Sequence, residues 1–229
     1  MIDILSFGGG VGSWGYAALV AQGKIRAPWM AAIVDTGREI TSTWEYIERH
    51  RSALTFDLHI IKQPLPSLWS GNGNSFLPGG FDIEGGAFMR GFCSSYWKRD
   101  VMRRWLVKKM GITAYNLAFG IHFDEWQRMT SARQKSVINI YPLVDLKITR
   151  ADCAQAALDV FGEIPPRSRC WMCPGQNTDD WEEVTSKYPE LYKAALEIDT
   201  ESRARANISI FGKYGEPPCG GQWTSSGSG

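Results

Sequence analysis

The chain has no marked excess of charge of either sign, and it has no long apolar segment. Its 25 Lys and Arg residues against 24 Asp and Glu give a formal net charge of +1, so no global field draws it onto nucleic acid or an anionic membrane. Its longest apolar runs have the length of a strand, far below the roughly 20 residues that span a bilayer. The opening residues 1–5 carry no basic leader. We therefore expect no secretory signal, no membrane partner and a cytoplasmic location.

Cysteine is also scarce, and the number of cysteines is odd. Five cysteines are scattered along the chain, which argues against a disulfide framework and favours metal binding or thiol chemistry. Aromatic residues are plentiful by contrast. Ten tryptophans favour a rigid core or stacking surfaces over disorder. The length of 229 residues is sufficient for a full hydrophobic core.

Strand-length apolar runs alternate with segments of helical periodicity. This order predicts an α/β fold, a mainly parallel five-stranded sheet with helices on both faces, of Rossmann-like type. Such sheets bind ligands beyond the carboxyl ends of their strands. The predicted strands are 2–7, 30–34, 56–61, 117–121 and 137–141, and the predicted helices are 11–22, 41–53, 94–110 and 150–161.

Two segments depart from this alternation. Residues 64–91 are rich in Gly, Pro, Ser and Asn, which predicts a long loop with a mobile or substrate-covering role. Residues 214–229 are rich in Gly, Pro and Ser, and we expect a loose tail. The predicted domains are accordingly a nucleotide-binding domain over 1–197, which includes a cysteine loop, and a partly flexible C-terminal extension over 198–229.

A glycine-rich loop joins the first predicted strand to the first predicted helix. Glycines allow a backbone to approach an anion closely, and successive amides, a helix N-terminus and serine hydroxyls can hold phosphate or sulfate oxygens. The loop lacks the lysine of a Walker motif and does not match the dinucleotide fingerprint. The alternative is a tight strand–helix turn with no ligand. The predicted phosphate-binding residues are Ser6, Phe7, Gly8, Gly9, Gly10 and Ser13.

With this loop the sequence resembles the PP-loop ATPases and, through residues 6–8, the sulfonucleotide (phosphoadenylylsulfate, PAPS, and adenylylsulfate) reductases. The ATPases usually carry an acidic residue where this chain has Gly12. Further motifs of the reductases follow in the family's order, up to about residue 175. Those motifs are 34–39 with 43–47, 93–99, 120–125 with Arg128, 141–143, and the Arg-Cys-x-x-Cys-Pro segment 169–174.

The resemblance implies an enzyme that binds ATP or a phosphosulfate nucleotide, and Mg²⁺ could bind together with the nucleotide. It implies that Asp35 and Thr36 face the adenine and ribose. By the same resemblance, Gly120, Asp124 and Arg128 lie on the phosphate side. The implied catalytic residues are Asp124, Lys98 and Cys219. His122 is the only histidine near a motif, and a structural role is the alternative for it.

Cysteine spacing points to a metal. Cys170 and Cys173 place two thiolates on one proline-stiffened loop, and thiolates select zinc or iron–sulfur clusters. We predict an iron–sulfur cluster, of 4Fe-4S type with zinc as the fallback. Its predicted ligands are Cys93, Cys170, Cys173 and Cys219. Three alternatives to a four-cysteine cluster remain. They are a three-cysteine cluster with an open iron, a catalytic thiol at Cys219, and a set of reduced core thiols. Cys153 lies at helical spacing among apolar residues and is expected in the core.

Basic residues concentrate between positions 90 and 109, where seven Lys and Arg residues accompany one Asp. They could form a path for nucleic-acid phosphates. The alternative is a solvated helix face.

Three functions fit these patterns. The first is ATP-dependent sulfur transfer to a nucleic acid, tRNA or DNA, with a cysteine desulfurase as the sulfur donor. The second is a PAPS or adenylylsulfate reductase that releases sulfite and uses a thioredoxin-like reductant. The third is a nucleotide-binding, metal-stabilised module without catalysis. The first two make the protein a transferase or an oxidoreductase, and a homodimer is compatible with each of the three.

Overall fold

A computed structural model of the protein describes residues 1–212, and contacts within the chain define two compact units. The sheet unit comprises Met1–Pro66 and Ser95–Arg169, and the hairpin unit comprises Ser67–Ser94 and the chain from Cys170 onward. Cys219 and the predicted loose tail lie outside the described residues. These units divide the chain differently from the predicted domains 1–197 and 198–229, because residue 197 lies inside helix α7 (Pro189–Ala206). The domain assignment itself stays a prediction.

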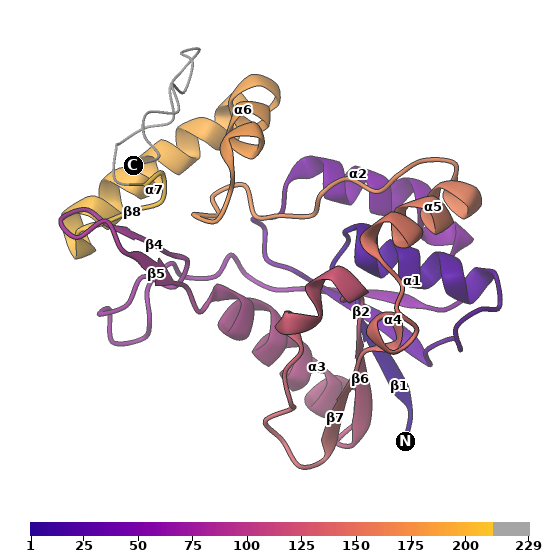
Figure 1. Cartoon of the computed structure of the whole chain (residues 1–229). Coiled ribbons are helices and arrows are strands. Elements are labelled where there is room, and N and C mark those ends of the chain that lie inside the picture. Colours follow the sequence, from indigo (N-terminus) through magenta and orange to yellow (C-terminus); the bar gives the residue numbers. More distant parts are fainter. Residues whose placement is uncertain (213–229) are drawn as a thin grey trace. The chain divides into compact units, whose positions relative to one another are not determined.

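The sheet unit is built on five parallel strands in the order β3-β2-β1-β6-β7. This confirms the predicted α/β fold. Figure 1 labels β1, β2, β6 and β7 of this sheet. The chain proceeds from β1 to β2 on one side and later returns to β6 on the other side of β1. The carboxyl ends of β1 and β6 therefore form the switch point at which such sheets bind ligands. The strands are β1 (Asp3–Ser6), β2 (Met30–Asp35), β3 (Leu58–Lys62), β6 (Tyr115–Phe119) and β7 (Val137–Ile140).

Helices cover both faces of this sheet because strand side chains alternate between the faces. Leu5 and Ile33 belong to the cluster that includes side chains of α1 (Val11–Ala21), α2 (Thr41–His50) and α5 (Arg150–Phe161). Their neighbours Ile4 and Val34 belong to a second cluster with α3 (Asp100–Met110). Short helical segments connect these elements: η1 (Arg51–Ala53), η2 (Ser94–Arg99), η3 (Phe123–Arg128) and α4 (Pro142–Asp145).

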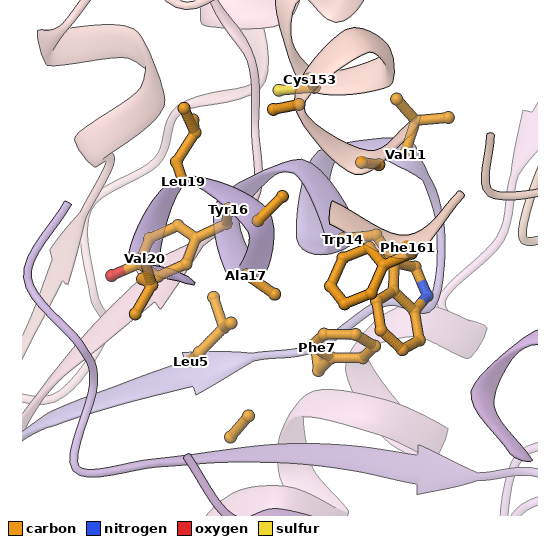
Figure 2. Packing of buried hydrophobic residues seen from close by; sticks show 14 of the residues in the cluster. Leu5, Phe7, Val11, Trp14, Tyr16, Ala17, Leu19, Val20, Cys153 and Phe161 are labelled. Carbon is orange, nitrogen blue, oxygen red and sulfur yellow. The ribbon is translucent and has the colours of Figure 1, made fainter. Parts of the chain in front are cut away.

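The larger core lies between β1, α1 and α5 (Figure 2). Trp14 is fully buried, and its ring meets those of Phe7 and Phe161 edge-on at centroid distances of 5.0 Å. Helices α1 and α5 touch where a Cβ on Gly15 would lie 2.4 Å from the Cβ of Cys153. Cys153 is 0% exposed, which confirms the expected core position.

The hairpin unit contains a small antiparallel sheet in the order β5-β4-β8. Its strands are β4 (Gly79–Asp82), β5 (Phe88–Arg90) and β8 (Ile208–Ser209), and its helices are α6 (Thr178–Lys187) and α7. The expected long loop over 64–91 is therefore interrupted, because β4 and β5 pair as a hairpin within it. Its mobile or substrate-covering role stays a prediction. The buried carboxylate of Asp199 on α7 accepts bonds from the Ser209 hydroxyl at 2.9 Å and the Ile210 amide at 2.7 Å, which ties the helix to β8.

Within residues 1–212, no helix combines the length and the hydropathy that a bilayer crossing needs.

Candidate functional site

The glycine loop lies at the carboxyl end of β1 and leads into α1. The Phe7 ring is buried in the core, and its amide donates to the Ala32 carbonyl at 2.9 Å, so only its carbonyl is left for a ligand. Gly9 has a φ of +78°, which favours glycine. A Cβ on Gly8 would have no atom within 4 Å, so the loop is open at that residue. The first-turn amides of α1 have no carbonyl one turn earlier in the helix, which is an arrangement suited to an anion.

Gly12 and Gly120 bring two backbone segments into direct contact. A Cβ on Gly12 would lie 1.9 Å from the Gly120 carbonyl oxygen, and a Cβ on Gly120 would lie 2.7 Å from the Ser13 amide nitrogen. The start of α1 is therefore pressed against the residue that follows β6. This contact explains why no acidic residue stands at position 12, because any side chain there would collide with the backbone.

Glu39 joins the glycine loop to two distant segments of the sheet unit. Its side chain is 4% exposed and pairs with the Lys98 ammonium group at 2.9 Å. The Ser168 hydroxyl lies 2.8 Å from the second carboxylate oxygen of Glu39 and 2.6 Å from the Gly8 carbonyl oxygen. A hydroxyl has one proton for these two acceptors. The predicted catalytic Lys98 is thus held by a buried carboxylate that is itself linked to the loop.

Sequence reasoning missed Glu39 and Ser168 as site residues. Glu39 ends the segment 34–39 that resembles the reductases, and Ser168 precedes the Arg-Cys-x-x-Cys segment. Glu39 was therefore inside a recognised motif and Ser168 directly before one. Only the contact between them, over 129 positions of sequence, assigns both to the loop.

Thr43 adds a buried hydroxyl at the same place. It is 0% exposed, and its Oγ1 has no hydrogen-bond partner among the described residues. Its methyl group would lie 2.7 Å from a Cβ on Gly9. An unsatisfied buried hydroxyl costs about 1–3 kcal/mol, and it indicates a position that a ligand or water completes.

Asp35 and Thr36 shape the turn after β2. The Asp35 carboxylate accepts the Gly37 amide at 2.8 Å, and the Thr36 hydroxyl accepts the Arg38 amide at 3.3 Å. Thr36 is 2% exposed whereas Asp35 is half-buried. Of the two residues predicted to face adenine and ribose, Asp35 is the one with a surface that a ligand could reach.

Asp124 stands at the N-terminus of α5. Its carboxylate accepts the Arg150 amide at 2.6 Å and lies 3.3 Å from His122 Nδ1, without the alignment of a hydrogen bond. His122 is 4% exposed, which agrees with a structural role. Arg128 is an exposed side chain and bonds Glu125 at 2.5 Å. The predicted catalytic and phosphate-binding groups of this segment thus both have protein partners.

The described cysteines of the predicted metal site belong to the hairpin unit. Cys170 and Cys173 bracket a turn that is closed by the Cys173 amide donating to the Cys170 carbonyl at 3.1 Å. Trp171 and Met172, between them, are 7% and 0% exposed and anchor the turn. Cys93 begins the helical segment before α3, and its amide donates to the Leu77 carbonyl at 3.0 Å. All three cysteines are half-buried.

The part of the chain that the structure describes contains no group of three or more His, Cys, Asp or Glu side chains placed to hold one metal ion. The Cys170–Cys173 turn offers two sulfur donors of the kind that iron–sulfur clusters use. The described residues do not gather Cys93 with that pair, and Cys219 lies outside them. A complete ligand set therefore remains a prediction.

Comparison with known proteins gives only distant likenesses. No protein-family model matches the chain, and no curated protein matches it. A PAPS reductase from Candida auris, solved as a phosphate complex, is 14% identical over 72% of this chain and 74% of its own, with a TM-score of 0.41. The U34-tRNA thiolase NcsA from Methanococcus maripaludis, with its [4Fe-4S] cluster, is 17% identical over 90% of this chain and 71% of its own, with a TM-score of 0.45.

The chain is similar in fold to a PAPS reductase and a tRNA thiolase. The PAPS reductases are among the enzymes that the sequence motifs resemble. At such identities and TM-scores the likeness does not carry over an activity, a cofactor or a site residue to this chain.

Proposed function

We propose that the protein is an adenine-nucleotide-binding enzyme of sulfur chemistry that activates a nucleic acid with ATP and transfers sulfur to it. The observation that carries the nucleotide part is the glycine loop. It combines an open backbone at Gly8, the first-turn amides of α1 and an unsatisfied hydroxyl at Thr43, all at the switch point of a parallel sheet.

Around this loop the residues have separable tasks. The amides of the loop and of the first turn of α1 hold phosphate oxygens. The Glu39 carboxylate positions Lys98 beside the loop, because the Ser168 hydroxyl lies within hydrogen-bond distance of both that carboxylate and the Gly8 carbonyl. The exposed edge of Asp35 is left for the sugar or the base.

The sulfur part of the proposal relies on the cysteines. Cys170 and Cys173 supply two thiolates from one hydrogen-bonded turn, and Cys93 with Cys219 would complete a 4Fe-4S site. When bound, such a cluster would supply the sulfur or electron chemistry of the reaction. We assign no individual step to it, since the described residues alone do not assemble the site.

A thermal-shift titration tests the nucleotide site. A ligand that binds only the folded state adds about 2.7 kcal/mol to the unfolding free energy at 100 times its Kd. We expect ATP to raise the unfolding midpoint. In Lys98→Met we expect the Kd for ATP obtained from this titration to be about tenfold higher. Lys24→Met, which removes an exposed ammonium group before β2, is the matched control. An unchanged midpoint with ATP, AMP and adenylylsulfate alike would refute a nucleotide site.

Anaerobic purification tests the metal part. We expect a brown protein with iron and acid-labile sulfide, and loss of both in Cys170→Ser and Cys173→Ser. Cys153→Ser is the control thiol, because Cys153 is buried in the sheet unit's core. A colourless anaerobic preparation with neither iron nor zinc would contradict the cluster and leave the nucleotide site standing.

A phosphosulfate reductase is the second candidate, and Gly12 favours it. The acidic residue that PP-loop ATPases usually carry there is excluded by the Gly120 carbonyl, and a reductase of this family does not adenylate its substrate. Tighter binding of adenylylsulfate or PAPS than of ATP, together with sulfite release that Cys219→Ser abolishes, would select this candidate. Nucleotide binding without either turnover would leave a non-catalytic module.

A further inference from the structure

The hairpin unit contains a pocket of about 470 Å³, and none of its lining residues belongs to the glycine loop of the sheet unit. Its size falls within the range of about 300–1,000 Å³ that is typical of small-molecule sites. The loop before β4, the hairpin β4–β5 and the end of α7 form its walls. The larger side chains of its lining include Trp69, Met89, Arg90, Phe92 and Arg205.

One wall is a preassembled stack. The Arg205 guanidinium lies 4.0 Å from the centroid of the Trp69 ring. Glu201 accepts a bond from the Trp69 indole nitrogen and another from Arg205, each at 3.0 Å. Because one carboxylate bonds both partners, it restrains the ring and the guanidinium in positions from which they can contact a planar ligand. Cation–π pairs of this kind are themselves stabilising.

Another part of the lining consists of exposed apolar side chains. Met89 is 47% exposed and Phe92 57% exposed. In the hairpin, Arg90 pairs with Gly79 and Met89 with Gly80, so glycines stand where cross-strand side chains would otherwise lie. Neither glycine could carry a side chain cheaply, because a Cβ would lie 2.2 Å from the Met89 carbonyl oxygen or 2.5 Å from an Ile208 carbon.

The charge of the pocket selects an anion. Its lining includes two arginines and no acidic residue. Arg90 forms no ion pair with any residue in 1–212, whereas Arg205 is paired with Glu201. A ligand that satisfies these walls has a planar, apolar part and a negative charge. A nucleoside phosphate has both, and sequence-tolerant nucleic-acid sites combine stacking side chains with basic ones in this way.

We propose that this pocket binds one nucleotide unit of a single-stranded nucleic acid, with the base stacked on the aromatic walls and the phosphate on Arg90. The identity of this strand as the sulfur acceptor rests on the proposed function, whereas the binding of a strand in the pocket is independent of it. Phe92 directly precedes Cys93 in the chain, so a strand held here would be bound by the segment that carries one of the predicted sulfur ligands.

Fluorescence anisotropy with labelled single strands of roughly 12 nucleotides, RNA and DNA, tests the pocket. Both changed side chains are exposed, so the variants are expected to fold. We expect Arg90→Ala and Phe92→Ala each to weaken binding about tenfold. Arg90→Ala also lowers the slope of log affinity against log salt by about one, whereas Phe92→Ala leaves that slope unchanged. Arg26→Ala and Trp29→Ala, at exposed positions before β2, are the matched controls.

Competition with unlabelled ligands distinguishes a nucleic-acid strand from a free nucleotide, since both offer a base and a phosphate. Unlabelled single strands should displace the probe at lower concentration than a duplex or free nucleoside monophosphates. Displacement by free nucleotides at equal concentration would reassign the pocket to a metabolite and overturn the nucleic-acid proposal. Unchanged affinity in both variants would remove the pocket from the binding surface. Strand binding is measured without ATP and the ATP response is measured without a strand, so a failure of this pocket is distinct from a failure of the ATP site.

Discussion

Two glycines of the same loop are required for different reasons. Gly9 has a positive φ, which L side chains rarely adopt. Gly12 lies in the first turn of α1, and its restriction comes from the Gly120 carbonyl that occupies the position of its Cβ. Gly8 has neither restriction, because a Cβ there meets open space. The three positions look alike in the sequence and differ only through their surroundings.

Substitution of Gly12 and Gly8 should separate these effects. Gly12→Ala forces the start of α1 away from β6, and we expect a loss of roughly 2 kcal/mol or more of unfolding free energy, as for other overpacked sites. Gly8→Ala should change stability by less than about 0.5 kcal/mol. Urea denaturation of both variants measures the difference. Equal stability of the two would contradict the contact between Gly12 and Gly120.

At the scale of elements, the N-terminus of α5 is the best-capped helix end of the sheet unit. Thr149 and Asp152 form a capping box, and Asp124 accepts the amide of Arg150. Hydrogen bonds from the Thr149 side chain and backbone hold the pKa of Asp152 below its ordinary value. This end of the helix is therefore positioned by Asp124, a residue that the sequence motifs assign to catalysis.

Asp124 variants can distinguish capping from catalysis. Asp124→Asn keeps an oxygen acceptor for the Arg150 amide, so stability should stay within about 0.5 kcal/mol, while Asp124→Ala should lose about 1 kcal/mol. Thermal denaturation and turnover are measured together. An Asn variant that folds normally yet has no activity assigns the carboxylate to the reaction. Full activity in the Asn variant would make Asp124 a structural residue and remove it from the catalytic set.

At the scale of the whole molecule, the core of the sheet unit buries several weak acids, and three of them have strongly raised pKa values. Burial raises the pKa of Tyr16, Tyr46 and Cys153, each to about 12. Burial is the larger cause of each shift, and the nearby carboxylates of Asp3, Glu163 and Asp152 respectively contribute to the same rise. The folded state keeps all three groups protonated at pH values where the unfolded chain has lost those protons.

Stability should therefore fall in alkaline solution. A raised folded-state pKa contributes stability that is complete below the unfolded pKa, 9.0 for the thiol and 10.0 for the phenols, and is lost as the pH rises toward 12. Each group contributes a slope of about 1.4 kcal/mol per pH unit in that window. Urea denaturation between pH 8 and 11 measures the decline. In Cys153→Ala its onset should move from about pH 9 to about pH 10, and an unmoved onset would show that the thiol ionises in the folded state.

The sequence by itself determined the sheet unit and the position of its loop. Hydrophobic periodicity is a local property, so runs such as 30–34 and 150–161 were readable as the strand and helix that the structure contains. The small sheet of the hairpin unit was not readable. Its strands have two to four residues and include Gly79 and Gly80, which weaken any strand signal.

Only the tertiary structure decided which distant residues meet. It brought Glu39 to Ser168 and Gly12 to Gly120, and it built the pocket around Trp69 from the two ends of the hairpin unit. No local pattern encodes such pairs, because each depends on how strands and helices close on one another after they form. Composition and spacing indicated the kind of ligand that the glycines and cysteines could bind. The packing of distant segments against one another determined which residues those side chains and backbone groups contact.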